Sequence, residues 1–414
     1  MHDIKAPWQA LLFADDTDFR SKAARVFSHQ LRHLPVYRSF CDHLHRSGVS
    51  QIDPDDYSDP NSGLFQRPSK KMPENSRENA STNLPVSLCG TSPTNLPDPD
   101  ILPLMPVQAF RDSQVRADYV REPQATFKSS GTSGSAQSTH PVADLSLYLH
   151  SCLEGFARFY DPGEWSILAW LPGYADNPHS SLLTMIGHFI ERDPTGQSRF
   201  LPLDKHPTQH DFRAVTDQGR RVMLFGAAFG LLDLLDDLNP DQPPIPSTHS
   251  EVSGLHRPDQ PPIPSTPLLP LPRGSVIVET GGMKTRRRER TRHELHRELA
   301  AGFGLPETSI HSEYGMAETS SQAWDNGSGR FRTPPWMRIT IRDATNPMRV
   351  LPPGREGLVG IIDLANVHSL AFLLTQDRGV AWPDGSFQVL GRKRHAPLRG
   401  CNFLMEADTF DSWP

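Results

Sequence analysis

The stretch 129–134 of this sequence, Ser-Ser-Gly-Thr-Ser-Gly, combines hydroxyl side chains with two glycines that leave the backbone accessible. Backbone N–H groups and hydroxyls that converge in this way can hold the oxygens of a phosphate group. The stretch lacks the Gly-Lys-Ser/Thr ending of a Walker loop, and taken alone such a cluster is more often an ordinary turn. The first candidates for phosphate binding are Ser129, Ser130, Gly131, Thr132, Ser133 and Gly134.

Three further motifs follow this loop along the chain. They are His-Ser-Glu-Tyr-Gly-Met-Ala-Glu-Thr at 311–319, Thr-Gln-Asp-Arg-Gly at 375–379 and Leu-Gly-Arg at 390–392. In this order, the four motifs resemble those of the adenylate-forming superfamily, which contains acyl-CoA synthetases, peptide-synthetase adenylation domains and luciferases. Enzymes of that superfamily hold ATP phosphates with a Ser/Thr/Gly-rich loop, flank adenine with a Tyr-Gly-x-x-Glu motif and bind the ribose with an aspartate.

Within that superfamily, the chain is most similar to the LuxE-type acyl-protein synthetases, the fatty-acid ligases of the bacterial bioluminescence reductase complex. The stretches that carry this similarity are 103–110, 127–132, 171–174 with 180–182, 279–284, 390–392 and 399–401. The resemblance covers most of 100–405. It implies an enzyme that uses ATP and Mg²⁺ to convert a carboxylic acid, expected to be a fatty acid, into an acyl-adenylate. The acyl group would then pass to a thiol of the enzyme or of a partner.

The resemblance assigns a nucleotide-binding role to the matching residues. It implies that the 129–134 loop holds the ATP phosphates and that Gly281 and Gly282 let the backbone pass close to adenine. It also implies that Tyr314, followed by Gly315, stacks near the base. These residues come from three separate parts of the chain, which the fold must bring together.

The resemblance also assigns the polar contacts of the site. It implies that Glu318 positions Mg²⁺, which bridges phosphate oxygens and offsets the charge that develops as the carboxylate attacks the α-phosphorus. Asp377 would accept hydrogen bonds from the ribose hydroxyls, and Arg392 would add positive charge near the sugar or phosphate. Taken alone, Asp377 is as typical of a turn or cap as of a binding site.

Two residues are candidates for a catalytic role at positions where the chain differs from the wider superfamily. Many relatives end the phosphate loop with a lysine, and here we expect His140 to take part of that role, although a lone histidine is more often a cap or packing residue. Cys401 lies near Arg399 and Arg394, which can lower the pKa of a thiol. The resemblance suggests that Cys401 accepts the acyl group as a thioester with release of AMP. A packed structural cysteine is the equal alternative.

Alternatives remain open both for the acceptor of the acyl group and for the activity itself. A partner that receives the acyl group is expected to be an acyl reductase or a carrier protein. The same fold also serves acyl-CoA and aryl-CoA ligases, but the short stretch after Arg392 leaves little room for their C-terminal domain. The proline-rich insertions and the basic residues after Arg392 also fit a non-catalytic nucleotide-binding scaffold. The presence of Glu318 and Asp377 argues against that scaffold.

The hydrophobic pattern predicts the elements that position these residues. Short apolar runs that alternate with longer helical periodicities favour an α/β fold with a large parallel or mixed sheet, covered by helices, and a smaller β-rich section near the end. We expect helices over 142–160 and 231–238. The expected strands are 166–171, 222–225, 275–279, 358–363 and 387–390.

Two proline-rich stretches interrupt this pattern. Residues 61–100 and 239–272 contain few large apolar side chains, so burial cannot offset the entropy lost on ordering, and we expect mobile insertions. The second contains Pro-Asp-Gln-Pro-Pro-Ile-Pro-Ser-Thr twice, which indicates a duplicated surface linker, with a partner-docking motif as the alternative. We expect one adenylate-forming domain over 1–395 and a vestigial C-terminal segment over 396–414, in place of a full C-terminal domain.

Composition excludes several classes of protein. The net charge of −6 gives no general attraction for nucleic acid or an anionic membrane. The basic run 284–292 is interleaved with glutamates nearby and has no aromatic platform, so we interpret it as a solvated helix start. No apolar run is long enough to span a membrane, the N-terminus does not resemble a signal peptide, and the four cysteines show no metal-ligand spacing. These features favour a cytoplasmic protein.

Overall fold

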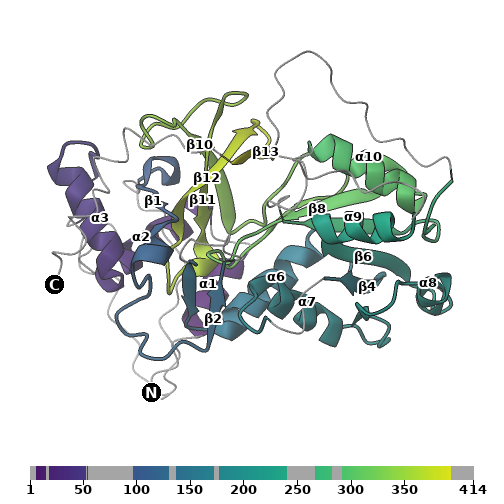
Figure 1. Cartoon of the computed structure of the whole chain (residues 1–414). Helices are drawn as coiled ribbons and strands as arrows, with labels where there is room; N and C mark the ends of the chain where they lie inside the picture. The colour runs from purple at the N-terminus through teal and green to yellow at the C-terminus, as the bar shows by residue number, and fades with distance from the viewer. Residues whose placement is uncertain are drawn as a thin grey trace, which may run out of the picture.

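The computed structural model describes residues 6–14, 18–52, 54, 97–129, 137–171, 177–239, 266–281 and 291–392. These residues form three β-sheets with helices packed around them (Figure 1). The fold is of the predicted α/β class, with layered mixed sheets. None of the helices in the described part of the chain is long and apolar enough to cross a membrane.

A six-stranded sheet forms the first layer, in the order β5-β4-β6-β7-β8-β9. Its first five strands are parallel and β9 is antiparallel to β8. The strands are β4 (Trp165–Trp170), β5 (Arg199–Phe200), β6 (Arg221–Ala227), β7 (Val276–Thr280), β8 (Ile310–Tyr314) and β9 (Ala323–Asp325). All residues of β4, β7 and β9 are buried, as expected for strands covered on both faces.

Two groups of helices cover the opposite faces of this sheet (Figure 1). Alternate strand residues such as Leu224 and Phe225 point into different core clusters, because successive side chains of a strand face opposite sides. One face packs against α6 (Leu145–Ala157) and α7 (Ser181–Glu191). The other packs against α8 (Gln209–Thr216), α9 (Ala228–Asp237) and α10 (Arg292–Phe303).

A second, five-stranded sheet contains the C-terminal strands. It follows the order β1-β12-β11-β10, and β13 pairs with β12. The strands are β1 (Met105–Pro106), β10 (Met337–Arg342), β11 (Glu356–Asp363), β12 (Phe372–Ala381) and β13 (Phe387–Arg392). The N-terminal helices α1 (Ala6–Phe13), α2 (Phe19–His33) and α3 (Pro35–Arg46) share one hydrophobic core with this sheet. The first and last parts of the described chain therefore fold together.

Short elements complete the fold. A third sheet is the hairpin of β2 (Ala125–Lys128) and β3 (Thr139–Val142), which brackets the candidate phosphate loop. The remaining elements are α5 (Ala109–Asp112) and the 3₁₀ turns η1 (Pro99–Ile101), η3 (Glu307–Ser309) and η4 (Leu364–Asn366).

The structure corrects three boundaries predicted from the sequence. The helix expected over 142–160 is shorter, because Val142 pairs with Ala125 in the β2–β3 hairpin and Asp144 caps the N-terminus of α6. Residues 97–100 do not belong to a mobile insertion, since Arg20 Nε donates to the carbonyl of Pro97 at 3.2 Å. Residues 266–272 likewise pack on the fold through backbone hydrogen bonds to the end of α10. The predicted domain boundary at 395 falls outside the described residues.

Candidate active site

Three residues predicted to bind the nucleotide meet where β8 ends beside β12 and β13. The hydroxyl of Tyr314 donates a hydrogen bond to Asp377 Oδ2 at 2.8 Å, and Arg392 Nε donates to Asp377 Oδ1 at 3.0 Å. The Asp377 side chain is 11% exposed, whereas that of Arg392 is 62% exposed. The fold thus fixes the carboxylate from two sides and leaves the guanidinium at the surface.

The protonation of Tyr314 suits this arrangement. Burial and the neighbouring Asp377 carboxylate raise the pKa of Tyr314 well above its ordinary value, so its hydroxyl remains a donor. The backbone N–H of Asp377 donates to Thr375 Oγ1 at 3.1 Å, and the Thr375 hydroxyl donates to the carbonyl of Val359 at 2.8 Å. Asp377 is therefore held through its backbone as well as its side chain.

The ring of Tyr314 packs in an aromatic cluster that the sequence did not indicate. Its centroid lies 5.7 Å from that of Phe331 and 5.8 Å from that of Phe387. The guanidinium of Arg292 lies over the ring of Phe331, 4.0 Å from its centroid. Phe331 belongs to no motif recognised in the sequence, and its partners are distant along the chain.

Arg292 corrects the interpretation of the basic run as a solvated helix start. It is the first residue of α10, but its side chain is only 23% exposed and forms ion pairs with Asp325 at 3.1 Å and Glu279 at 3.6 Å. Burial lowers the pKa of Arg292, and the two carboxylates oppose that shift. The other basic residues of the run, at 284–290, lie outside the described part of the chain.

The two described glycines of the site are constrained in different ways, Gly281 by its backbone conformation and Gly315 by its close neighbours. Gly281 follows β7 with a φ of 76°, a left-handed conformation that favours glycine. A side chain at Gly315 would overlap Oε1 of Glu313 and would crowd Gln322. Gly282 lies outside the described residues.

Glu313 is a buried carboxyl that the sequence analysis did not single out. It is 7% exposed and accepts a hydrogen bond from the hydroxyl of Thr280, its partner across β7 and β8. Burial raises the pKa of Glu313 to about 7, and the hydrogen bond from Thr280 lowers it in part. Its position inside the motif at 311–319 was visible in the sequence, but its burial was not.

Glu318 lies in the bend that follows β8, and this bend is held from three directions. Asn366 Nδ2 donates to the carbonyl of Glu318 at 2.8 Å. The backbone N–H groups of Ser320 and Ser321 both donate to Asp363 Oδ2, at 2.7 and 2.9 Å. His140 Nδ1 lies 2.7 Å from the carbonyl oxygen of Ala317.

The carboxylate of Glu318 fits a metal that is held mainly by a nucleotide. Among the described residues, no hydrogen bond or ion pair occupies this carboxylate, and no group of three or more acidic, histidine or cysteine side chains could hold a metal ion. Mg²⁺ commonly binds through one or two carboxylates together with substrate phosphates. One carboxylate such as that of Glu318, which has no partner in the described part of the chain, is therefore enough for such a site.

His140 does not have the environment of a phosphate-binding cation. It is 1% exposed and packs edge-on against Phe110 and Phe127. Burial lowers the pKa of His140 to about 4, although hydrogen bonds to Ala317 and Asn366 oppose this shift. At neutral pH the ring is uncharged, so the expectation that it replaces the loop lysine is not supported.

Several predicted residues lie outside the described part of the chain. These are Ser130, Gly131, Thr132, Ser133, Gly134 and Cys401. Ser129 is described, and it closes the base of the loop through two hydrogen bonds with Ser138, at 3.0 and 3.1 Å. Of the two cysteines that the structure describes, Cys152 is fully buried with a pKa raised to about 12, and burial also raises the pKa of Cys41. Neither would provide a thiolate.

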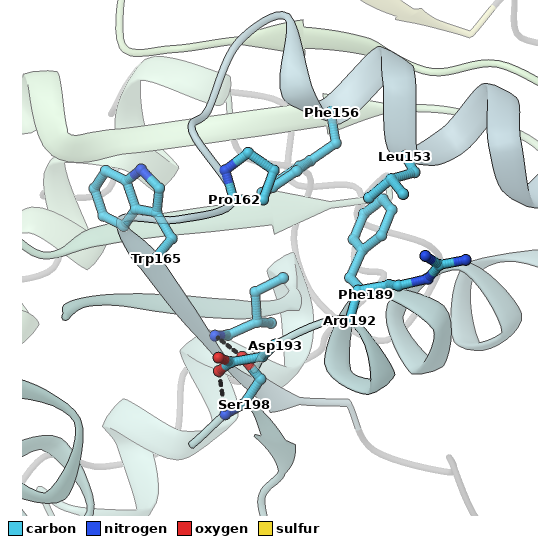
Figure 2. A pocket seen from close by; sticks show the side chains of 9 residues that line it. Leu153, Phe156, Pro162, Trp165, Phe189, Arg192, Asp193 and Ser198 are labelled. Carbon is cyan, nitrogen blue, oxygen red and sulfur yellow. Dashed lines mark hydrogen bonds between the residues drawn. The ribbon is translucent and has the colours of Figure 1, made fainter. Parts of the chain in front are cut away.

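A separate pocket opens at the amino ends of the strands of the six-stranded sheet, near the start of β4. Figure 2 shows Leu153 and Phe156 of α6, Phe189 of α7 and Trp165 at the start of β4 around this space. One of the polar residues that line it, Asp193, already accepts hydrogen bonds from the backbone and hydroxyl of Ser198. Ligands of parallel α/β sheets bind beyond the carboxyl ends of strands, and Tyr314 lies at that end of β8. The pocket is therefore not part of the candidate site.

Part of the chain also matches a known protein family in sequence. Residues 268–409 match the model of the family described as acyl-protein synthetase, LuxE. This match confirms the resemblance to the LuxE-type acyl-protein synthetases. It covers about a third of the chain and includes Tyr314, Glu318, Asp377, Arg392 and Cys401. The match supports the predicted enzyme class, an AMP-forming ligase of the acyl-protein synthetase type.

Solved structures resemble the chain over a longer range. The chain matches 2-hydroxyisobutyryl-CoA ligase in an open conformation, with a TM-score of 0.50, 13% identity and coverage of 90% of this chain and 69% of the ligase. The same ligase in the postadenylation state gives a TM-score of 0.52, 12% identity and coverage of 90% and 67%. At these identities the likeness shows the fold alone, which this chain shares with the ligase.

Other matches are more partial. ATP-bound MatB from Rhodopseudomonas palustris has a TM-score of 0.42 and 15% identity, with coverage of 65% of this chain and 48% of MatB. The chain thus spans about half the length of MatB. None of the curated proteins matches the chain in sequence.

Proposed function

We propose that the chain activates a carboxylic acid with ATP and then transfers the acyl group to a thiol. The observation that carries the proposal is the convergence of Tyr314, Asp377 and Arg392 near the bend of Glu318, inside the region matched by the LuxE family. The acid is predicted to be a fatty acid, as the LuxE resemblance implies. The proposed adenylate-forming domain comprises residues 1–395.

In the first step, a carboxylate oxygen of the acid forms a bond to the α-phosphorus of ATP. The bond from that phosphorus to the bridging oxygen breaks, and pyrophosphate leaves with the electron pair. Tyr314 would place its ring against the base. Asp377 would accept hydrogen bonds from the ribose, since each carboxylate oxygen can accept more than the single bond it already receives.

The remaining residues of the site would interact with the phosphates and with the metal ion. Arg392 has an exposed guanidinium that can donate further hydrogen bonds to the ribose or phosphate. Glu318, together with the phosphate oxygens, would hold Mg²⁺, which when bound offsets negative charge at the phosphates. Backbone hydrogen bonds to Asn366 and Asp363 fix the segment around Glu318 before a ligand arrives.

In the second step, a thiolate sulfur attacks the acyl carbon of the adenylate. The carbon–oxygen bond to the phosphate breaks, AMP leaves, and a thioester remains. Cys401 is the acceptor proposed within the chain, and a cysteine or carrier group of an acyl-reductase or carrier protein is the proposed acceptor outside it. Cys152 is unsuitable because its thiol is buried and protonated.

Coenzyme A is the second candidate acceptor. The ligase with the same fold was crystallised with 2-HIB-AMP and CoA, which favours this alternative. Measuring thioester products with and without CoA separates the two. Acyl-CoA formation that requires added CoA, with no label on protein, would support the CoA ligase.

The proposal is tested with Glu318→Gln, which removes the negative charge and keeps the size of the side chain. AMP formation from ATP, Mg²⁺ and a fatty acid should fall at least a hundredfold. The matched control is Glu307→Gln, because Glu307 is a half-exposed glutamate of η3 in the same family-matched region. Equal activity of the native chain and Glu318→Gln would contradict the role of Glu318.

A further inference from the structure

His140 connects the base of the candidate phosphate loop to the segment that carries Glu318. It lies in β3, two residues after Ser138, and Ser138 is hydrogen-bonded to Ser129 on the opposite side of the loop. From this position the ring reaches Ala317, 177 residues further along the chain. One side chain thus joins β3 to the turn that carries Glu318.

The geometry defines which atom makes the contact. The partner of Nδ1 is a backbone carbonyl oxygen, which can only accept, so Nδ1 must carry the proton and donate to Ala317 at 2.7 Å. The ring is buried between Phe110 and Phe127, which restrict its orientation. A neutral ring with the proton on Nδ1 is consistent with the lowered pKa of His140.

The segment on the other side is also fixed. Asn366 donates to the carbonyl of Glu318 at 2.8 Å, directly after the carbonyl that His140 contacts. Ser320 Oγ donates to Asn366 Oδ1 at 3.1 Å. Two consecutive carbonyls, those of Ala317 and Glu318, are therefore held by side chains from two separate elements, β3 and η4, and these contacts restrict the position of Glu318.

We propose that His140 is a positioning residue that holds the turn carrying Glu318 against β3 through its Nδ1–H bond to Ala317. This inference rests on the proposed function. The positioning role takes the place of the cationic role that the sequence predicted for His140, because a buried, uncharged ring supplies no positive charge to the phosphates. Loss of the bond would let this turn shift away from β3, and a metal ion held by Glu318 together with nucleotide phosphates would bind more weakly.

Two neutral substitutions distinguish positioning from other roles. The amide nitrogen of Asn in His140→Asn can occupy the place of Nδ1 and keep the bond to Ala317. The longer side chain in His140→Gln places its amide nearer to the position of Nε2 and loses that bond. Neither variant carries charge, so a cationic role would be abolished equally in both. His210→Asn, on the exposed side of α8, is the control.

The experiment measures pyrophosphate exchange as a function of Mg²⁺ and of acid concentration. We expect the Mg²⁺ concentration for half-maximal exchange to rise at least tenfold in His140→Gln and less than threefold in His140→Asn, while the KM for the acid stays within twofold in both. Equal loss in the two variants, or a parallel rise in the KM for the acid, would overturn the proposal. Thermal unfolding of each variant confirms that the protein tested is folded.

A second readout keeps this inference separate from the proposed function. The dissociation constant of Mg²⁺–ATP, measured by calorimetry, should follow the same order, with His140→Gln weaker than His140→Asn and the native chain. If the native chain binds Mg²⁺–ATP but exchanges no pyrophosphate with any acid, the proposed function fails and the binding order still tests His140. Equal affinity of all three proteins would overturn the positioning role.

Discussion

The hydroxyl of Tyr314 lies 2.8 Å from Oδ2 of Asp377 and joins the last residue of β8 to the middle of β12. The bond connects the six-stranded sheet to the five-stranded sheet. Because Arg392 of β13 contacts the other oxygen of the same carboxylate, residues from both sheets define one small polar surface. The proposed ribose site therefore exists before nucleotide binds.

Substitution of Asp377 tests this surface. In Asp377→Asn, the negative charge beside the Arg392 guanidinium is lost, and an NH₂ group replaces one of the two carboxylate oxygens that accept from Tyr314 and Arg392. We expect the KM for ATP to rise about tenfold or more, whereas Tyr314→Phe, which keeps the ring, should raise it only about threefold. Initial rates of AMP formation at varied ATP concentration measure both values.

Asp384→Asn is the control for this prediction. Asp384 lies in the turn between β12 and β13 and also pairs with an arginine, Arg332, at 2.8 Å, but its side chain is 47% exposed. Its substitution should leave the KM for ATP unchanged. Equal effects of the two aspartate substitutions would mean that Asp377 has no special contact with the nucleotide.

Substitution of Arg292 is expected to lower the free energy of unfolding. Arg292→Ala leaves Glu279 and Asp325 as buried carboxylates without this cation, and such losses cost about 3 kcal/mol or more. Arg349→Ala should change the free energy of unfolding by less than about 0.5 kcal/mol, because Arg349 is 67% exposed and pairs with Asp343 at the surface. Urea unfolding of both variants gives the comparison. A stability loss below 1 kcal/mol for Arg292→Ala would contradict the buried ion pairs.

Glu313 predicts a specific dependence of stability on pH. Its pKa is raised from 4.5 to about 7, so the folded state holds a proton that the unfolded state has released at pH 5 to 7. The stabilisation is complete below pH 4.5 and is lost as pH rises through 7, by about 3 kcal/mol in total. Glu313→Gln cannot release a proton and lacks this loss.

The difference in unfolding free energy between the native chain and Glu313→Gln isolates this effect. The native chain should become less stable relative to the variant as pH rises from 5 to 8. Other titrating groups cancel in the difference, since both proteins contain them. A difference that stays constant over this range would show that the Glu313 carboxyl titrates normally.

Cys401 is tested by covalent labelling. With ATP and a radiolabelled fatty acid, the native chain should retain label that hydroxylamine releases, as a thioester does, and Cys401→Ala should not. Cys152→Ala should retain the label, because the Cys152 thiol is fully buried. Label retained by Cys401→Ala would direct the search to another acceptor.

Sequence pattern predicted the buried strands well and the long-range contacts poorly. The strands β4, β6 and β7 appear within two residues of their predicted bounds, because continuous apolar runs are typical of strands covered on both faces. Tyr314, Asp377 and Arg392 were identified by their motifs, and the structure brings them together. The predicted helix over 142–160 was too long because pairing of Val142 with Ala125 depends on a hairpin, not on local periodicity.

The environments of single residues could not be predicted from local sequence. Arg292 is buried because Asp325 and Phe331 surround it, and neither contact leaves a signal in a basic run. His140 is uncharged because its carbonyl partner is 177 residues away and aromatic rings cover it. Such properties arise only from the assembled fold.

ATP–pyrophosphate exchange with a series of carboxylic acids tests the central proposal most directly. With Mg²⁺ present, we expect the native chain to incorporate labelled pyrophosphate into ATP when a fatty acid is added, and to do so without CoA or any other thiol. Asp377→Asn and Glu318→Gln should reduce that exchange sharply, while Asp384→Asn should not. Absence of exchange from the folded native chain with every acid in the series would contradict acid activation by adenylation.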